Sequence, residues 1–379
     1  RCSICDNPHR QRIAMDSPNR APETSKLTPS EAKQVPFKEK LPNIEDTLQM
    51  ARLANMVYDA KPIGSYKAAL AANKQAGKSV DPKDKYKQHL VDVGGERTEM
   101  WYYECEAEGT EAIITFSPKN NRCTVVFRGT ETKGEAFLKD AFADIKGLGW
   151  KVPLAGPDDD EEDEHPECKV HMGFRGQYYG TVTEFRNDGE VREELRADGK
   201  IVDMVLETAL FQKVDKVLQL QKELKKDTEI FVTGHSLSAA LSVLCGIRLA
   251  LKYPEHNIQV INFGCPKVGN PAFWELVNNK ENLCVQRVAH KSDVITRAPN
   301  LDYNHVGHTI HIDENAEPRA FKWHAGCHFW TNWNPIVGVF EGGVGHHLMD
   351  SYIKALNTHA NKSNPSSEKQ WVAEYAEVE

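Results

Sequence analysis

Apolar residues recur at helical spacing between residues 44 and 60, in the segment IEDTLQMARLANMVYDA. This spacing predicts an amphipathic helix. A more polar stretch at 65–76 is expected to form a second helix. Three runs of apolar and β-branched residues follow at 99–106, 111–117 and 123–129, with short turns between them. Consecutive strands joined by short turns predict an antiparallel meander.

The pattern changes in the second half of the chain. Short apolar runs at 229–235, 257–264 and 283–290 predict strands, and they alternate with helical patterns at 237–253 and 271–279. The helix at 237–253 is apolar nearly all round, so we expect it to be buried. Strands that alternate with helices indicate crossover connections and a parallel sheet. The sequence therefore predicts an α/β protein in which a meander leads into a parallel core.

One domain is expected over residues 44–358, because no linker-like stretch divides the core. Residues 1–43 are rich in Pro, Ser, Lys and Arg and predict a poorly ordered N-terminal tail or arm. Residues 359–379 are expected to form a C-terminal tail. A polar segment at 186–203 is interpreted as an insertion before a helix at 204–226.

The net charge of −8 arises in one short segment. Seven acidic residues form the run DDDEEDE at 158–164, in a loop expected at 155–167, and the 47 basic residues almost balance the other acidic ones. We interpret the run as a solvated loop, with calcium binding as the alternative. The charge pattern predicts no basic face for nucleic acid. No run of 18 apolar residues is present, so no membrane-spanning helix is expected.

The nine cysteines are scattered along the chain: Cys2, Cys5, Cys105, Cys123, Cys168, Cys245, Cys265, Cys284 and Cys327. An odd count in a chain of 379 residues favours free thiols in a reducing compartment over a dense disulfide framework. An intracellular location (cytoplasm, plastid or lipid-droplet surface) is therefore favoured over secretion. Since the chain begins with Arg1 rather than Met, its N-terminus is expected to be incomplete.

Two groupings have the residue types of a metal site but not its pattern. Cys2 and Cys5 have a metal-like spacing without a second ligand pair nearby, so we interpret them as incidental residues of the tail. His305, His308 and His311 follow each other at intervals of three, which on a strand points neighbouring side chains to opposite faces. Neither grouping predicts a bound metal.

The stretch GHSLSAALS, residues 234–242, carries the candidate nucleophile. A serine on a sharp strand-to-helix turn usually occurs as Gly-x-Ser-x-Gly, where small residues permit the curvature. Gly234 and Ser236 fit this pattern, but Ser238 replaces the second glycine. Overpacking by Ser238 is expected to cost about 1–3 kcal/mol. Its hydroxyl is predicted to bond back to the carbonyl of Gly234.

A serine hydroxyl needs a base to take its proton and an acid to orient that base. Asp293 follows the predicted strand 283–290, which places its carboxylate at the same sheet edge as Ser236. Asp302 is the alternative acid. The base is expected among His346 and His347, at the start of a C-terminal helix.

Several motifs, in order along the chain, resemble those of the class 3, or fungal-type, lipases of the α/β-hydrolase fold. They are TVVFRGTE, KVHMGF, VTGHSLSAAL, INFGCPKVGNPAF, RVAHKSDVITRAP, YNHVGHTIHI and HLMDSYI. The resemblance covers roughly residues 44–358. It implies a central, mostly parallel sheet with antiparallel N-terminal strands, helices on both faces and a helical lid.

Carried over by position, the resemblance implies Ser236 as nucleophile, Asp293 as orienting acid and His347 as base. His347 is preferred to His346 because the segment HLMDSY matches the spacing from histidine to tyrosine in the family. The N–H groups of Thr130 and Leu237 are implied as the oxyanion hole.

The lid is expected at 131–150, in ETKGEAFLKDAFADIKGLGW. Phe137, Leu138 and Phe142 fall on one side of a helix there, and a permanently docked amphipathic helix is the alternative interpretation. Asp144 is expected to brace the oxyanion loop.

The resemblance implies hydrolysis of carboxylic esters of lipids through an acyl-enzyme, without metal or cofactor. An acylglycerol lipase acting at an oil–water or membrane interface is expected, with a phospholipase or galactolipase as the alternative. No nucleic acid and no obligate protein partner is implied. A catalytically silent lipase-like binding or signalling module is the alternative from a different class.

Overall fold

The computed structural model describes residues 36–40, 43–59, 97–129, 151–157, 165–187, 190–191, 196–197, 200–201, 204–299, 303–321, 343–362 and 375–376. All of them belong to one compact unit, Pro36–Glu379. The predicted helix at 65–76, the predicted lid at 131–150 and the acidic run at 158–164 lie outside the described residues. The tail prediction for 1–35 also lies outside them.

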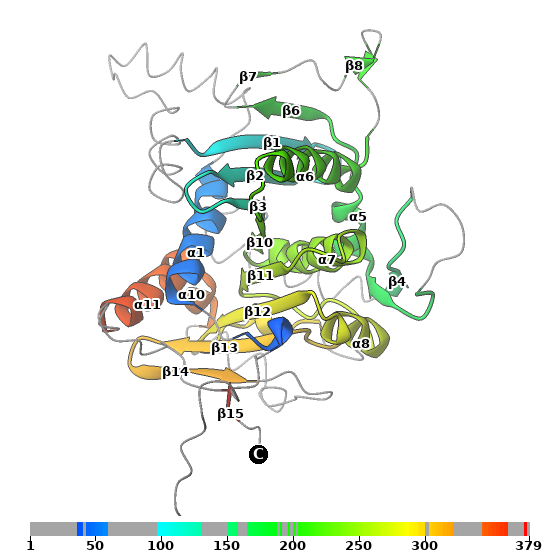
Figure 1. Cartoon of the computed structure of the whole chain (residues 1–379). Coiled ribbons are helices and arrows are strands. Elements are labelled where there is room, and N and C mark those ends of the chain that lie inside the picture. The colour runs from blue at the N-terminus through cyan, green and yellow to red at the C-terminus, as the bar shows by residue number, and fades with distance from the viewer. Residues whose placement is uncertain are drawn as a thin grey trace, which may run out of the picture. The chain divides into compact units, whose positions relative to one another are not determined.

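In the described part of the chain, eleven strands form one sheet in the order β15-β14-β13-β12-β11-β10-β3-β2-β1-β6-β7 (Figure 1). Their bounds are β1 Glu99–Cys105, β2 Thr110–Ser117, β3 Arg122–Phe127, β6 Glu184–Asn187, β7 Glu190–Val191, β10 Glu229–Gly234, β11 Ile258–Phe263, β12 Leu283–His290, β13 His308–Asp313, β14 Ala316–Phe321 and β15 Tyr375–Ala376. Two small sheets pair β4 Lys151–Pro153 with β5 Lys169–His171 and β8 Arg196–Ala197 with β9 Lys200–Ile201.

The centre of the large sheet is parallel and its N-terminal strands are antiparallel. Strands β3, β10, β11, β12 and β13 pair in parallel, whereas β1 with β2 and β2 with β3 pair antiparallel. The predicted meander and the predicted parallel core are therefore both confirmed. Parallel pairing follows from the helical crossovers, because a tight turn can only join antiparallel strands.

Helices cover both faces of the sheet. They are α1 Ile44–Asp59, α5 Met172–Tyr178, α6 Leu206–Glu223, α7 Leu237–Lys252, α8 Pro271–Asn279, α10 Gly343–His347 and α11 Met349–Lys362, with 3-10 turns η1 Phe37–Glu39 and η3 Ile295–Arg297. The core cluster on one face contains residues of α5, α6, α7 and α8, and the cluster on the other face contains residues of α1 and α11. Figure 1 shows α6, α7 and α8 on the opposite side of the strands from α1 and α11.

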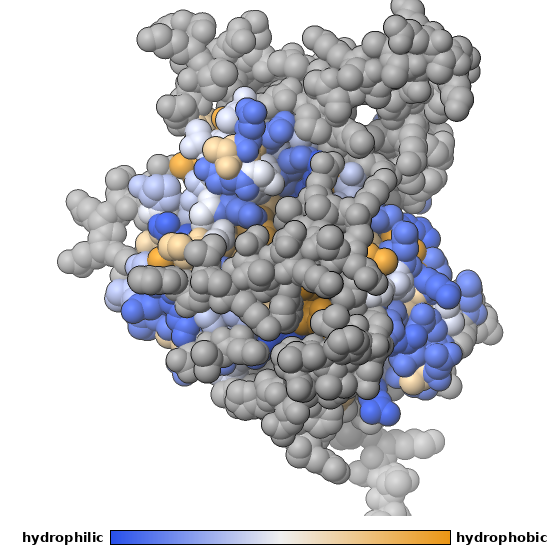
Figure 2. Space-filling model, turned by 180° about the vertical axis from the view of Figure 1, so that it is seen from behind, coloured by the Kyte–Doolittle hydropathy of each residue, from blue (hydrophilic) through white to orange (hydrophobic). Residues whose placement is uncertain are grey.

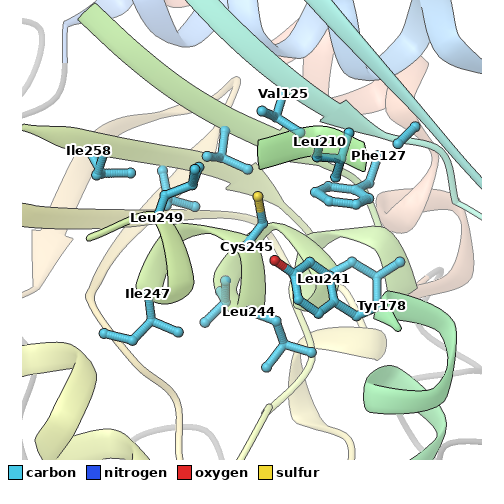
Figure 3. Close-up of a cluster of buried hydrophobic side chains, with 14 of the residues drawn as sticks. Val125, Phe127, Tyr178, Leu210, Leu241, Leu244, Cys245, Ile247, Leu249 and Ile258 are labelled. Atoms are coloured by element: carbon cyan, nitrogen blue, oxygen red, sulfur yellow. The ribbon is translucent and has the colours of Figure 1, made fainter. Parts of the chain in front are cut away.

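Alternate strand residues enter the two clusters. Val125 of β3 packs in the cluster with α7, and its neighbour Val126 packs in the cluster with α1 and α11. This alternation is the period of a pleated strand. Figure 3 shows Cys245 of α7 close to Tyr178 and Phe127 inside the first cluster. The helix α7 is buried almost throughout, as its all-round apolar sequence predicts.

Two helices begin at residues that cap them. The side chain of Asn43 accepts a hydrogen bond from the Glu45 N–H at 2.8 Å, just before α1. Asn270 caps α8 by accepting from the Phe273 N–H at 3.0 Å, and Pro271 occupies the first helical position. Asparagine before the helix and proline at its start both satisfy or avoid backbone N–H groups that lack helical partners.

Three segments differ from the sequence-based predictions. Residues 186–203 were expected to be an insertion only, but Glu184–Asn187 pairs with β1 and extends the sheet. Residues 36–40, assigned to a tail, are bound to strands β12 and β13, since the carbonyls of Lys38 and Lys40 accept hydrogen bonds from His308 and Gln286. Helix α11 continues to residue 362, beyond the predicted end of the domain at 358.

Few large apolar side chains of the described residues are exposed: Met172, Leu220, Leu224 and Leu348. Figure 2 shows one face of the molecule, on which the described residues are mostly hydrophilic. Among the described residues no helix is both long and apolar enough to cross a membrane.

The contact between α7 and β11 gives a first prediction. Alanine is usually favoured over glycine inside a helix by about 1 kcal/mol. At Gly246, however, a Cβ atom would collide with the Cγ2 atom of Val260, which is stiff at χ1. Gly246→Ala should therefore lower the free energy of unfolding by about 1–3 kcal/mol in urea titrations.

The matched test is the same substitution in a Val260→Ala background, which removes the colliding methyl group. There Gly246→Ala should be neutral or stabilising. An equal loss in both backgrounds would contradict this account of the close approach.

Candidate active site

The candidate nucleophile Ser236 lies on a sharp turn between β10 and α7. Its backbone has φ 64° and ψ −130°, a positive φ that residues other than glycine seldom adopt. The Ser236 N–H donates to the carbonyl of Phe263 at the end of β11, at 3.0 Å. The turn thus places a strained serine at the C-terminal edge of the parallel strands, directly before a helix N-terminus.

Close packing explains the glycine at position 234. A Cβ atom there would collide with the backbone carbonyl group of Ser238. The Ser238 hydroxyl accepts from the His235 N–H at 2.9 Å and donates to the His235 carbonyl at 2.7 Å. The predicted acceptor, the carbonyl of Gly234, is therefore wrong, because the tight turn brings residue 235 closer. Ser238 is fully buried, and its hydroxyl closes the turn instead of only crowding it.

Asp293 and His347 form a buried pair. The Nδ1 atom of His347 lies 2.8 Å from Oδ2 of Asp293, and the two residues are only 2 % and 1 % exposed. Asp293 follows β12, and His347 ends α10. An ionised carboxylate only accepts hydrogen bonds, so Nδ1 of the imidazole carries the proton and Nε2 is left to accept one.

Several donors keep the buried Asp293 ionised. Burial raises the pKa of its carboxyl group, but the charge of His347 and hydrogen bonds from His347, Tyr352 and the Ile295 N–H lower it further, so that the net shift is downward. The Tyr352 hydroxyl donates at 2.5 Å and the Ile295 N–H at 2.9 Å. A carboxylate held in this way can orient an imidazole and stabilise its protonated form.

The turn of Ser236 and the buried pair meet at Gly264. This residue follows Phe263, which accepts the Ser236 N–H, and it has a positive φ of 61°. A Cβ atom on Gly264 would lie 2.8 Å from the His347 ring and 2.9 Å from the Asp293 carboxylate. Glycine is required here because the backbone passes directly against the pair.

A second histidine, His235, packs against His347 and bonds to its backbone. The His235 ring lies 4.5 Å from the His347 ring, centroid to centroid. Its Nε2 atom lies 2.7 Å from the His347 carbonyl oxygen, and its Nδ1 atom 2.8 Å from the hydroxyl of Tyr58 in α1. Sequence reasoning missed these roles. Only the place of His235 beside Ser236 gives a local signal, since Tyr58 is 177 residues away.

Some of the remaining candidate site residues are described by the structure and the others lie outside the described part. Leu237 is the first residue of α7, so its N–H belongs to the N-terminus of the helix. His346 does not pair with Asp293, and its Nδ1 atom lies 2.9 Å from the Ser292 hydroxyl. Outside the described residues lie Thr130, Phe137, Leu138, Phe142, Asp144 and Asp302.

The three histidines spaced at intervals of three do not share a ligand site, because each contacts a different backbone carbonyl group. His305 contacts Thr296, His308 contacts Lys38, and His311 contacts Lys291. Among the described residues, one grouping has ligand atoms within 4.8 Å of one another, namely His165, Glu167 and Cys168. These three residues precede β5 and take no part in the hydrogen bonds around Asp293 and His347.

Comparison with known proteins shows which proteins the chain is similar to. Residues 124–303 match the family model of lipase (class 3). A lipase from Rhizopus microsporus var. chinensis superposes with a TM-score of 0.52 at 19% identity, covering 83% of this chain and 92% of that one. A lipase from Yarrowia lipolytica gives a TM-score of 0.53 at 20% identity, covering 81% and 92%.

These matches support the class 3 lipase family for residues 124–303 of the chain. The two superpositions confirm the α/β-hydrolase fold predicted from the sequence. Among curated relatives, phospholipase A1-IIdelta of Arabidopsis thaliana is 30% identical over 52% of this chain and 46% of its own length. The lipase of Rhizopus niveus is 26% identical over 50% and 38%. The chain thus spans less than half the length of these two relatives.

The hydroxyl of Ser238 gives a second prediction. Ser238→Ala leaves the buried His235 N–H without its partner, which typically costs about 1–3 kcal/mol. The free energy of unfolding from urea titration should fall by that amount. Ser351→Ala is the matched control, because its hydroxyl also donates to a carbonyl but at an exposed site. Equal stability of the two variants would show that the Ser238 hydroxyl does not hold the turn.

Proposed function

We propose that this protein is a class 3 lipase, a serine esterase that hydrolyses carboxylic esters of lipids. The observation that carries the proposal is the buried Asp293–His347 pair, together with a serine of positive φ directly after β10. The three residue types follow the chain order of the α/β-hydrolases, with serine first, then aspartate, then histidine. In this proposal Ser236 is the nucleophile, His347 the base and Asp293 the orienting acid.

The reaction proceeds in two halves. His347 Nε2 takes the proton of the Ser236 hydroxyl as the serine oxygen attacks the acyl carbonyl. The ester bond then breaks, and the alcohol leaves with the proton from His347. Water, deprotonated by the same nitrogen, releases the fatty acid from the acyl-enzyme. Asp293 stabilises the imidazolium in both halves, which its several hydrogen-bond donors support by keeping it ionised.

The oxyanion of the tetrahedral intermediate needs two N–H donors, and each donor lowers the reaction barrier by about 2.7–4 kcal/mol. Leu237 fits one of these roles, because its N–H is at the start of α7 and next to Ser236. Thr130 is proposed as the second donor. It follows Gly129, which packs so closely that a Cβ atom there would lie 2.9 Å from the His235 carbonyl oxygen. Residues 131–150 are proposed as the lid, with Phe137, Leu138 and Phe142 facing the acyl chain and Asp144 bracing the oxyanion loop.

Acylglycerols are the proposed substrates, taken from an oil–water or membrane interface. The alternative substrate is a membrane phospholipid or galactolipid, which the phospholipase A1 names of several relatives favour. A catalytically silent binding module requires that a reacting residue be absent or displaced. The paired Asp293 and His347 argue against that alternative.

The nucleophile assignment can be tested with a fluorophosphonate probe, which phosphonylates activated serines. The wild-type protein should be labelled and Ser236→Ala should not. Asp293→Asn keeps the shape of the side chain but favours the wrong imidazole tautomer, so labelling and ester hydrolysis should slow by about 10⁴-fold.

Matched controls carry the same chemical changes on α11. Ser351→Ala and Asp350→Asn should be labelled at the wild-type rate, because neither side chain bonds to the pair. Unchanged labelling of Ser236→Ala would remove Ser236 from the mechanism.

The substrate class needs a separate measurement. Products should be analysed after incubation with a mixed panel of triacylglycerols, phospholipids, galactolipids and a short soluble ester. We expect free fatty acid mainly from acylglycerols, with higher activity on aggregated than on soluble substrate. Preferential release from phospholipids would favour the alternative, and hydrolysis of the soluble ester alone would reject a lipid substrate.

A further inference from the structure

Two consecutive carbonyl groups at the end of α10 are each held by a buried imidazole. The carbonyl oxygen of His347 lies 2.7 Å from Nε2 of His235, and that of His346 lies 3.1 Å from Nδ1 of His290. His235 follows β10 and His290 ends β12. The turn that carries the proposed base is therefore hydrogen-bonded to side chains at the ends of two strands of the parallel sheet.

The first imidazole is neutral. The carbonyl of His347 can only accept, so Nε2 of His235 carries a proton, and Nδ1 can then accept from the Tyr58 hydroxyl at 2.8 Å. Burial, followed by the charge of His347, lowers the pKa of His235 to about 3. One ring proton is enough for both of its hydrogen bonds.

The second imidazole faces two acceptors. Nδ1 of His290 meets the His346 carbonyl, and Nε2 lies 3.2 Å from the Glu314 carboxylate. Burial opposes ionisation of Glu314, but hydrogen bonds from Lys291 and His290 hold its pKa at about 2, so this group also only accepts. A neutral imidazole has one N–H and one lone pair, and would set that lone pair against an oxygen in one of the two contacts.

We propose that His290 is a positioning residue that works as an imidazolium and, through the carbonyl of His346, holds His347 against Asp293. The proposal rests on the proposed esterase function of Ser236, Asp293 and His347, because it concerns the placement of that base. His290 is only 1 % exposed, so its charge depends on the groups around it rather than on water.

Those groups come from every element packed against the ring. The carboxylate of Glu314 contacts the His290 ring and favours its charge, whereas Lys291, which pairs with that carboxylate, opposes it. The further titratable neighbours are His311, Asp313, His346 and Tyr352. With a single ring proton, His290 would lose one of its two contacts and the α10 turn would loosen.

Ring-proton states can be read directly by NMR. With selectively ¹⁵N-labelled histidine, long-range ¹H–¹⁵N correlation distinguishes protonated from bare ring nitrogens for the 15 histidines. The signal of His290, identified by its loss in His290→Gln, should show both nitrogens protonated at pH 6. His235 is the internal control and should show one bare nitrogen throughout. A bare nitrogen on His290 at pH 6 would overturn the proposal.

Two substitutions of neighbouring charged residues leave His290 in place. The readout is the fluorophosphonate labelling rate of Ser236. Glu314→Gln removes the anion that contacts the His290 ring, so labelling should slow. Lys291→Gln removes a cation from the same carboxylate but keeps the anion, so labelling should stay at the wild-type rate.

In Glu314→Gln, labelling should be slower by about tenfold, less than the roughly 10²-fold loss caused by a 1 Å misplacement. Equal slowing in both variants, or no slowing in Glu314→Gln, would overturn the role of His290. If the wild-type protein is not labelled, the proposed function fails instead, and the NMR measurement still decides the charge of His290.

Discussion

The parallel register of β10, β11 and β12 is the constraint on which the site depends. Ile230 of β10 lies opposite Ile258 of β11, and Ile258 lies opposite Leu283 of β12. Strands paired in parallel end at the same edge of the sheet. The three segments that leave this edge carry Ser236, Gly264 and Asp293. Their convergence therefore follows from backbone pairing, before any side chain contributes.

Side chains then fix what the backbone brings together. The Ser236 N–H donates a hydrogen bond to the carbonyl of Phe263, which ties the turn to β11. The Ser238 hydroxyl bonds to both the N–H and the carbonyl of His235 and so closes the same turn. The positive φ of Ser236 is strain that the chain tolerates only because these contacts over-determine the turn. The replacement of a glycine by Ser238 is thus compatible with the turn, since its hydroxyl provides hydrogen bonds that glycine lacks.

Local pattern was enough to predict the meander, the parallel core and the helices α7 and α8. It proposed Asp293 with Asp302 as the alternative, and only the resemblance to class 3 lipases favoured His347 over His346. The structure places Nδ1 of His347 2.8 Å from Oδ2 of Asp293. Contacts between distant segments were not predictable. Tyr58 meets His235 across 177 residues, and the strand at Glu184–Asn187 is stabilised by pairing with β1 although its sequence is polar. Ser238 was assigned the wrong acceptor because the pitch of the turn depends on packing that sequence does not encode locally.

Burial disfavours the charged form of every ionisable group around the site, and hydrogen-bond partners decide whether each group is charged. His235 and Asp293 are both almost fully buried, which disfavours the charged form of each. Tyr58 supplies a donor that suits a neutral imidazole, so His235 stays neutral. Three donors surround Asp293, so it stays ionised despite burial. The charge distribution of the site is therefore set by whether each buried atom faces a donor or an acceptor, and the same reasoning assigns a proton to both nitrogens of His290.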